Sequence, residues 1–177
     1  MIALRSFVPS RLVVPIALIV LAVSGFAIQS AVAQDTEGAG VVVSGKATSA
    51  DVGLPIYPGA KPYKESTNNS DAARLGLWGG GFGFKLAVMQ MESSDAPAKV
   101  ADFYRKALSK YGDVLDCTNG GAKQDDSAKA LTCGDDKPDK GGMLFKAGSK
   151  KQQHIVGLDP KGSGTKFSLV YLWTKED

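Results

Sequence analysis

The sequence contains little of what enzymes and metal proteins commonly use for chemistry. It has one histidine, His154, and two cysteines in 177 residues. A Ser-His-Asp triad would need that histidine, and no G-x-S-x-G elbow accompanies it. The cysteines lack the C-x-x-C spacing that lowers a thiol pKa, and one histidine is too few for a dedicated zinc site. The sequence therefore predicts no catalytic, cofactor-binding or metal-binding residues.

Two glycine- or aspartate-rich segments resemble ligand loops without completing one. Residues 135–141 lack the second acidic ligand and the closing glutamate of an EF-hand loop. Residues 75–84 are not followed by the Gly-Lys-Ser/Thr of a phosphate loop. The second segment carries Trp78 and Phe82, which are the candidate contacts for a partner. The alternative is a bulged strand with Trp78 packed in the core.

Long hydrophobic runs are confined to the N-terminus. Arg5 and Arg11 precede an apolar stretch over 12–28, and small residues follow at −3 and −1 before Gln34. This layout predicts a signal peptide over 1–33. An uncleaved anchor is the alternative, but the stretch is shorter than the roughly 20 residues of a spanning helix. We expect a periplasmic or secreted protein with no stable membrane insertion after cleavage.

Basic and acidic side chains are nearly equal in number. Without Arg5 and Arg11 the chain carries 19 basic and 18 acidic side chains, a formal charge of +1. A nearly neutral, exported chain offers no electrostatic basis for binding nucleic acid. The 144 residues that remain are enough for one domain with a real core.

Cys117 and Cys133 both lie beyond the predicted signal peptide. An even pair in an oxidising compartment indicates a disulfide. The alternative is two free thiols in a reducing compartment. We expect the disulfide, closing a loop that includes a polar segment.

The mature chain divides into two parts. Residues 34–53 are rich in Gly, Ala, Ser and Thr, and predict a flexible leader. Residues 54–177 predict a single α+β domain. Its clearest element is an amphipathic helix over 96–111, capped by Ser94 or Asp95. The apolar stripe of this helix consists of Val100, Phe103, Tyr104, Ala107, Leu108 and Tyr111.

Strand patterns surround this helix. Residues 75–91 form a strand region that alternates as a half-buried strand from Phe82 onward, while glycines between 76 and 83 weaken it and indicate a bulge or bend. Shorter strands are expected over 114–117 and 130–132. Three further strands separated by turns, ending with 165–173, predict an antiparallel meander. The expected fold is one helix packed on a mainly antiparallel sheet of about five strands.

Two segments together carry a family resemblance. Residues 54–60 read LPIYPGA, and residues 94–104 read SDAPAKVADFY. The pair resembles a domain of exported bacterial proteins with a "YPGA" strap and a "DSP-x-KV-x-x-FY" helix, with Ala96 where that family usually has serine. The resemblance covers residues 54–175. It implies a bacterial origin and the fold, and it transfers no functional residue.

The sequence favours a non-catalytic exported domain that acts by binding or structural association. Its partner would be an unknown protein or a component of the cell envelope, met through a sheet edge or the aromatic segment. A small extracytoplasmic hydrolase or processing enzyme with an unrecognised carboxylate site is the alternative. Two converging carboxylates in a deep cleft would indicate the hydrolase, and a shallow apolar groove would indicate the binding domain.

Overall fold

The computed structural model describes residues 38–64, 70–120 and 130–175. They belong to one compact unit. The predicted signal peptide over 1–33 lies outside the described residues.

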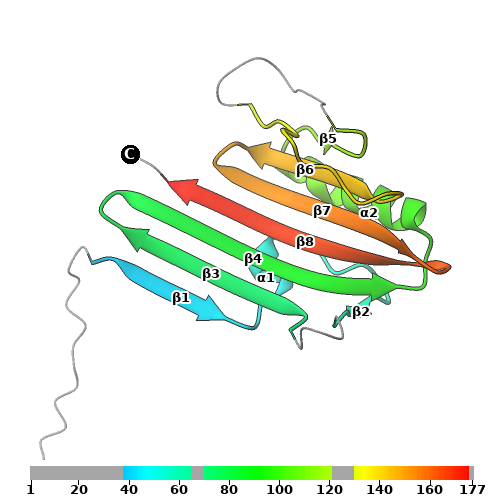
Figure 1. The fold of residues 1–177 in the computed structure, drawn as a ribbon, viewed down its shortest axis with the longest axis horizontal. Coiled ribbons are helices and arrows are strands. Elements are labelled where there is room, and N and C mark those ends of the chain that lie inside the picture. Colours follow the sequence, from blue (N-terminus) through cyan, green and yellow to red (C-terminus); the bar gives the residue numbers. More distant parts are fainter. Residues whose placement is uncertain (1–37, 65–69, 121–129, 176–177) are drawn as a thin grey trace, which may run out of the picture. The chain divides into compact units, whose positions relative to one another are not determined.

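An eight-stranded antiparallel sheet organises the unit, in the order β1-β3-β4-β8-β7-β6-β5, with β2 pairing with β4 (Figure 1). The strands are β1 Gly40–Ser44, β2 Lys61–Pro62, β3 Ala72–Gly79, β4 Phe82–Ser93, β5 Leu115–Asp116, β6 Met143–Ser149, β7 Gln152–Lys161 and β8 Gly164–Lys175. The predicted combination of a helix with a mainly antiparallel sheet is confirmed, but the sheet has eight strands rather than about five. The β6-β7-β8 meander matches the prediction, and no strand covers 130–132.

The expected single strand over 75–91 is wrong, because this region is the hairpin of β3 and β4. Gly80 and Gly81 have φ values of 53° and 85°. A two-residue hairpin turn of type I′ needs positive φ at both central positions, which glycine adopts without strain. The glycines that indicated a bulge therefore reverse the chain.

The predicted helix forms as α2, Pro97–Leu108, and continues as a 3-10 turn to Tyr111. It packs against β6, β7 and β8 on one face of the sheet (Figure 1). Val100, Tyr104 and Leu108 of the stripe are fully buried. The predicted cap is wrong, since Ala96 occupies the N-cap position and makes no side-chain hydrogen bond.

The expected leader over 34–53 is also wrong for its described part. Strand β1 pairs with β3 over five residues, and residues Ser49–Val52 form the short helix α1. Thr48 and Asp51 form a capping box at its start, each side chain bonding the other residue's backbone N–H. Val52 is fully buried. The composition of this segment is typical of a flexible chain, but the pairing of β1 with β3 and the burial of Val52 hold it in an ordered structure.

A strap over residues 54–60 follows α1 and lies under α2. The Tyr104 hydroxyl accepts a hydrogen bond from the Tyr57 backbone N–H and donates one to the Pro55 carbonyl, each over 3.2 Å. The Tyr57 hydroxyl donates to the Asp95 carboxylate over 2.6 Å. That bond raises the pKa of Tyr57 and lowers the pKa of Asp95. The strap thus satisfies its polar groups through helix α2.

The disulfide between Cys117 and Cys133 is confirmed. Both cysteines are buried in a small cluster that contains Leu115 and Leu131, with Leu144 packed against it. The cluster is separate from the main core under α2. The disulfide therefore ties Cys117, which follows β5, to Cys133, beside β6, the first strand of the meander.

Replacing Tyr104 with phenylalanine tests the strap contact. Tyr104→Phe keeps the ring but leaves a buried N–H and a carbonyl without their partner, so we expect a loss of about 1–3 kcal/mol in unfolding free energy. Lys106→Ala on the exposed face of α2 is the control, with an expected change below about 0.5 kcal/mol. Equal urea midpoints for the two variants would contradict the strap contact.

Removing the disulfide tests its energetic role. Replacing Cys117 and Cys133 together with alanine should lower the unfolding free energy by about 2–4 kcal/mol, because the unfolded chain regains loop freedom. Alkylation of the wild-type protein should require prior reduction and should add two labels. Labelling of the folded protein without reductant would show that the thiols are free.

Candidate functional site

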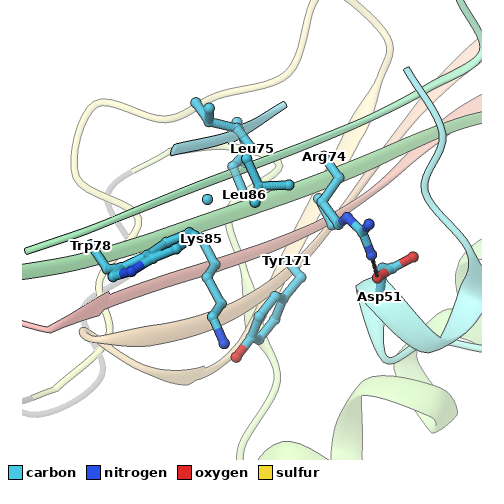
Figure 2. A pocket seen from close by; sticks show the side chains of 10 residues that line it. Asp51, Arg74, Leu75, Trp78, Lys85, Leu86 and Tyr171 are labelled. Atoms are coloured by element: carbon cyan, nitrogen blue, oxygen red, sulfur yellow. Dashed lines mark hydrogen bonds and ion pairs between the residues drawn. The ribbon is translucent and has the colours of Figure 1, made fainter. Parts of the chain in front are cut away.

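A shallow groove lies on the face of the sheet that carries the helices. Its volume is about 430 Å³. Figure 2 shows Trp78, Lys85 and Tyr171 projecting into it from β3, β4 and β8, while Leu75 and Leu86 project from the other side of the sheet. This is the alternation expected of paired strands. Helix α1 borders one end of the groove through Asp51.

Small residues make room for the aromatic rings on this surface. A Cβ atom on Gly40 would overlap the Trp78 ring, and one on Gly83 would lie 2.7 Å from the Trp173 ring. Gly76 and Ala87 line the groove between the larger side chains. Both tryptophans of the chain therefore lie close against the sheet at this end of the helix-bearing face.

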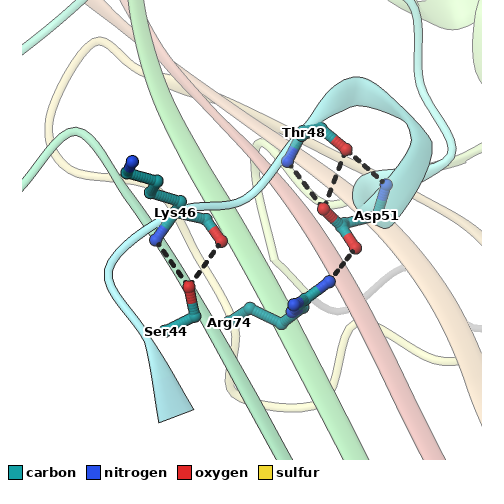
Figure 3. A network of polar contacts seen from close by, with 5 residues as sticks. All are labelled: Ser44, Lys46, Thr48, Asp51 and Arg74. Carbon is teal, nitrogen blue, oxygen red and sulfur yellow. Dashed lines mark hydrogen bonds and ion pairs between the residues drawn. The ribbon is translucent and has the colours of Figure 1, made fainter.

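Asp51 is the carboxylate of the groove, and it is already engaged. It accepts hydrogen bonds from the backbone and hydroxyl of Thr48, each over 2.8 Å, and pairs with Arg74 over 2.8 Å (Figure 3). The Thr48 hydroxyl contributes most to lowering its pKa, and Arg74 contributes next. Asp51 stays ionised at neutral pH, which does not suit a general acid.

The groove carries two cationic side chains. The Arg74 side chain is 47% exposed despite its ion pair with Asp51, so part of its guanidinium faces solvent. Lys85 Nζ lies 5.2 Å from the centre of the Trp173 ring, within cation–π range. Two cations and one paired carboxylate leave the groove with a positive excess. The described lining brings no second carboxylate toward Asp51, so it lacks the pair on which the hydrolase alternative depends.

His154 lies on β7 beneath α1, with its ring centre 5.0 Å from that of Tyr171 at the edge of the groove. It is 3% exposed, its ring stacks on Tyr111, and its Nδ1 lies 3.0 Å from the Val52 carbonyl oxygen. A carbonyl only accepts, so this bond assigns the proton to Nδ1. Nε2 is buried with no partner among the described atoms. The arrangement ties α1 to the sheet, in keeping with a structural histidine on a strand.

The structure places the two predicted contact residues at the β3–β4 hairpin. Trp78 is 49% exposed and Phe82 is 46% exposed, so packing of Trp78 in the core is wrong. Both border a second depression of about 390 Å³, and Trp78 also lines the main groove. Sequence reasoning missed Arg74 and Tyr171. Tyr171 lies in the expected strand over 165–173, but the sequence does not show that α2 leaves this end of the sheet face open.

The acidic loops show side-chain pairing rather than a cluster of ligands. Asp136 pairs with Lys146, whose ammonium group also approaches the Cys133 carbonyl. The described residues contain no group of three or more His, Cys, Asp or Glu side chains placed to hold a metal ion. Asp125 and Asp126 lie outside the described residues.

Comparison with known proteins gives no match to a protein-family model, a curated protein or a solved structure. Within the described ranges, none of the helices combines the length and the apolar character needed to cross a bilayer. The function must therefore be argued from the groove and the sheet.

The lone histidine makes the pH dependence of stability easy to assign. Burial lowers the pKa of His154 in the fold, more than the Val52 hydrogen bond raises it. The unfolded chain therefore binds a proton near pH 6.5, where the folded chain does not. Between pH 5 and 8, the His154 contribution should be level at the upper end of the interval, and stability should fall as pH drops below about 6.5.

Urea denaturation between pH 5 and 8 measures the slope of the unfolding free energy against pH. His154→Gln should be less stable than the wild type at neutral pH and should lose most of the slope, because no other side chain normally titrates in this interval. An unchanged slope in His154→Gln would assign the titration to another group.

Proposed function

We propose that this chain is an exported, non-catalytic bacterial domain that acts by binding. We further propose that its groove takes a ligand with a flat apolar group and a negative charge. The observation that carries the proposal is the half-exposed ring of Trp78 beside the cationic side chains of Arg74 and Lys85. The alternating strands project all three onto one face.

The apolar part of the ligand is argued from the rings and the floor of the groove. Figure 2 shows Trp78 and Tyr171 with the Lys85 side chain between them, and the small residues Gly76 and Ala87 also line the groove. A flat group that enters the groove can stack on an aromatic ring. The volume of about 430 Å³ lies within the usual range for small-molecule sites.

The negative charge of the ligand is argued from the electrostatic balance. Asp51 is bound by Thr48 and Arg74, so it offers little attraction to a cation. The guanidinium of Arg74 has five N–H donors and can hold a second carboxylate beside Asp51. Lys85 can approach the same anion from β4. A carboxylate or similar anion is therefore the favoured polar group.

Export is argued from two independent features. The first is the three-part layout of residues 1–33. The second is the disulfide between Cys117 and Cys133, which is typical of oxidising compartments. The resemblance of residues 54–60 and 94–104 to exported bacterial domains supports the same origin.

A matched pair of small probes tests the groove. N-acetylphenylalanine has a ring and a carboxylate, and its amide is the neutral control. Neither contains an indole, so the fluorescence of Trp78 and Trp173 reports binding directly. The acid should give a saturable change at lower concentration than the amide, because Arg74 and Lys85 attract the carboxylate.

Variants separate the groove from the rest of the surface. Trp78→Ala should weaken binding of the acid about fivefold or more, in line with roughly 1 kcal/mol for an aromatic contact. Phe82→Ala, at the neighbouring depression, should bind as the wild type does, with calorimetry as the readout for both. The absence of saturable binding, or equal losses in both variants, would refute this ligand class.

A further inference from the structure

Among the described residues, nothing at the first edge of the sheet supplies the features that usually protect an edge strand. Within the described residues, β1 pairs with β3 on one side and with no strand on the other. Its sequence, GVVVS, has no charge and no proline, and its five pairs to β3 run without a bulge. Val41 is 66% exposed and Val43 is 76% exposed. Such an edge is a template for another strand.

The opposite edge of the sheet provides an internal comparison. Strand β5 has two residues, one of them the charged Asp116. Cys117 follows at once and ties the chain to Cys133. Short length and charge are both known means of blocking edge pairing. The two edges therefore differ, and β1 is the longer and uncharged one.

We propose that β1 pairs with β1 of a second copy of this chain, antiparallel about a two-fold axis at Val42. In this register Val42 faces Val42 of the partner subunit, and Val41 faces Val43 of the partner subunit. The interface is isologous, as closed dimers require. This inference is independent of the ligand proposed for the groove.

Register and side-chain size favour this pairing. Two residues that pair directly across antiparallel strands project their side chains to the same face of the sheet. The helix-bearing faces of the two copies therefore lie on the same side only when the two-fold axis passes through a residue of β1. An axis at Val42 is the choice that pairs all five residues. Gly40 then faces Ser44 of the partner subunit, which is small enough for the Trp78 ring lying over Gly40.

The electrostatic balance puts little in the way of a second copy. The paired strands bring valine against valine and no charge against a like charge, which would be destabilising. The mature chain has a formal charge of +1, so two copies repel each other weakly. The pairing also joins the two grooves, because Val42 lines each groove at its β1 side.

Two double variants with matched positions test the register. In Val41→Lys with Val43→Lys, like charges would face each other across the axis. In Val41→Lys with Val43→Glu, opposite charges would face each other. Both sites are largely exposed, so both variants should fold with the thermal midpoint of the wild type.

Sedimentation of the purified protein over a concentration series provides the measurement. Five pairs make a small interface, so the wild type should form a dimer that dissociates on dilution. The lysine–lysine variant should raise the dissociation constant at least about tenfold, and the lysine–glutamate variant should remain within about threefold of the wild type.

A cross-link checks the axis directly. Directly paired antiparallel residues have Cα atoms about 4.5–5.5 Å apart, which suits a disulfide. Val42→Cys should therefore give a covalent dimer on oxidation, and Ile56→Cys, an exposed site on the strap, should not. A wild type that stays monomeric at every concentration, or equal dissociation constants for the two double variants, would overturn the proposal.

Discussion

The Tyr104 hydroxyl is the contact on which the helix-bearing layer depends. It bonds the strap at the Tyr57 N–H and the Pro55 carbonyl, across 47 and 49 residues of chain. Burial among apolar groups raises the pKa of Tyr104, so the hydroxyl stays protonated and can both donate and accept. With the strap held there, α1 reaches the sheet and Asp51 reaches Arg74 at the end of the groove.

The same contact explains why the LPIYPGA and SDAPAKVADFY segments occur together in one chain. Residues 54–60 and 94–104 lie in direct contact, through Tyr104 and through the bond between Tyr57 and Asp95. Neither segment lines the groove. What these residues specify is the packing of helix α2 on the strap, and the chemistry of the surface is left to other positions.

Local patterns predicted the parts of the fold that local physics decides. The stripe of α2 and the alternation of β8 follow from side-chain period, and the disulfide follows from an even pair of cysteines. The role of residues 40–53 could not be read this way, because their composition suits a flexible segment and their order comes from pairing with β3. The groove escaped prediction for a similar reason. It exists because α2 covers β6 to β8 and stops short of Trp78, which is a property of tertiary packing.

The disulfide also determines how many edges of the sheet are open to pairing with another strand. Strand β5 contributes two residues, and Cys117 directly after it is bonded to Cys133. A chain whose thiols stay reduced would hold β5 weakly, and the seven-residue β6 would become a second open edge. One open edge on a symmetric axis gives a closed pair, whereas two different open edges allow head-to-tail growth without an end. With β1 paired as proposed, the oxidised chain would stop at two copies, whereas a chain with a second open edge would polymerise.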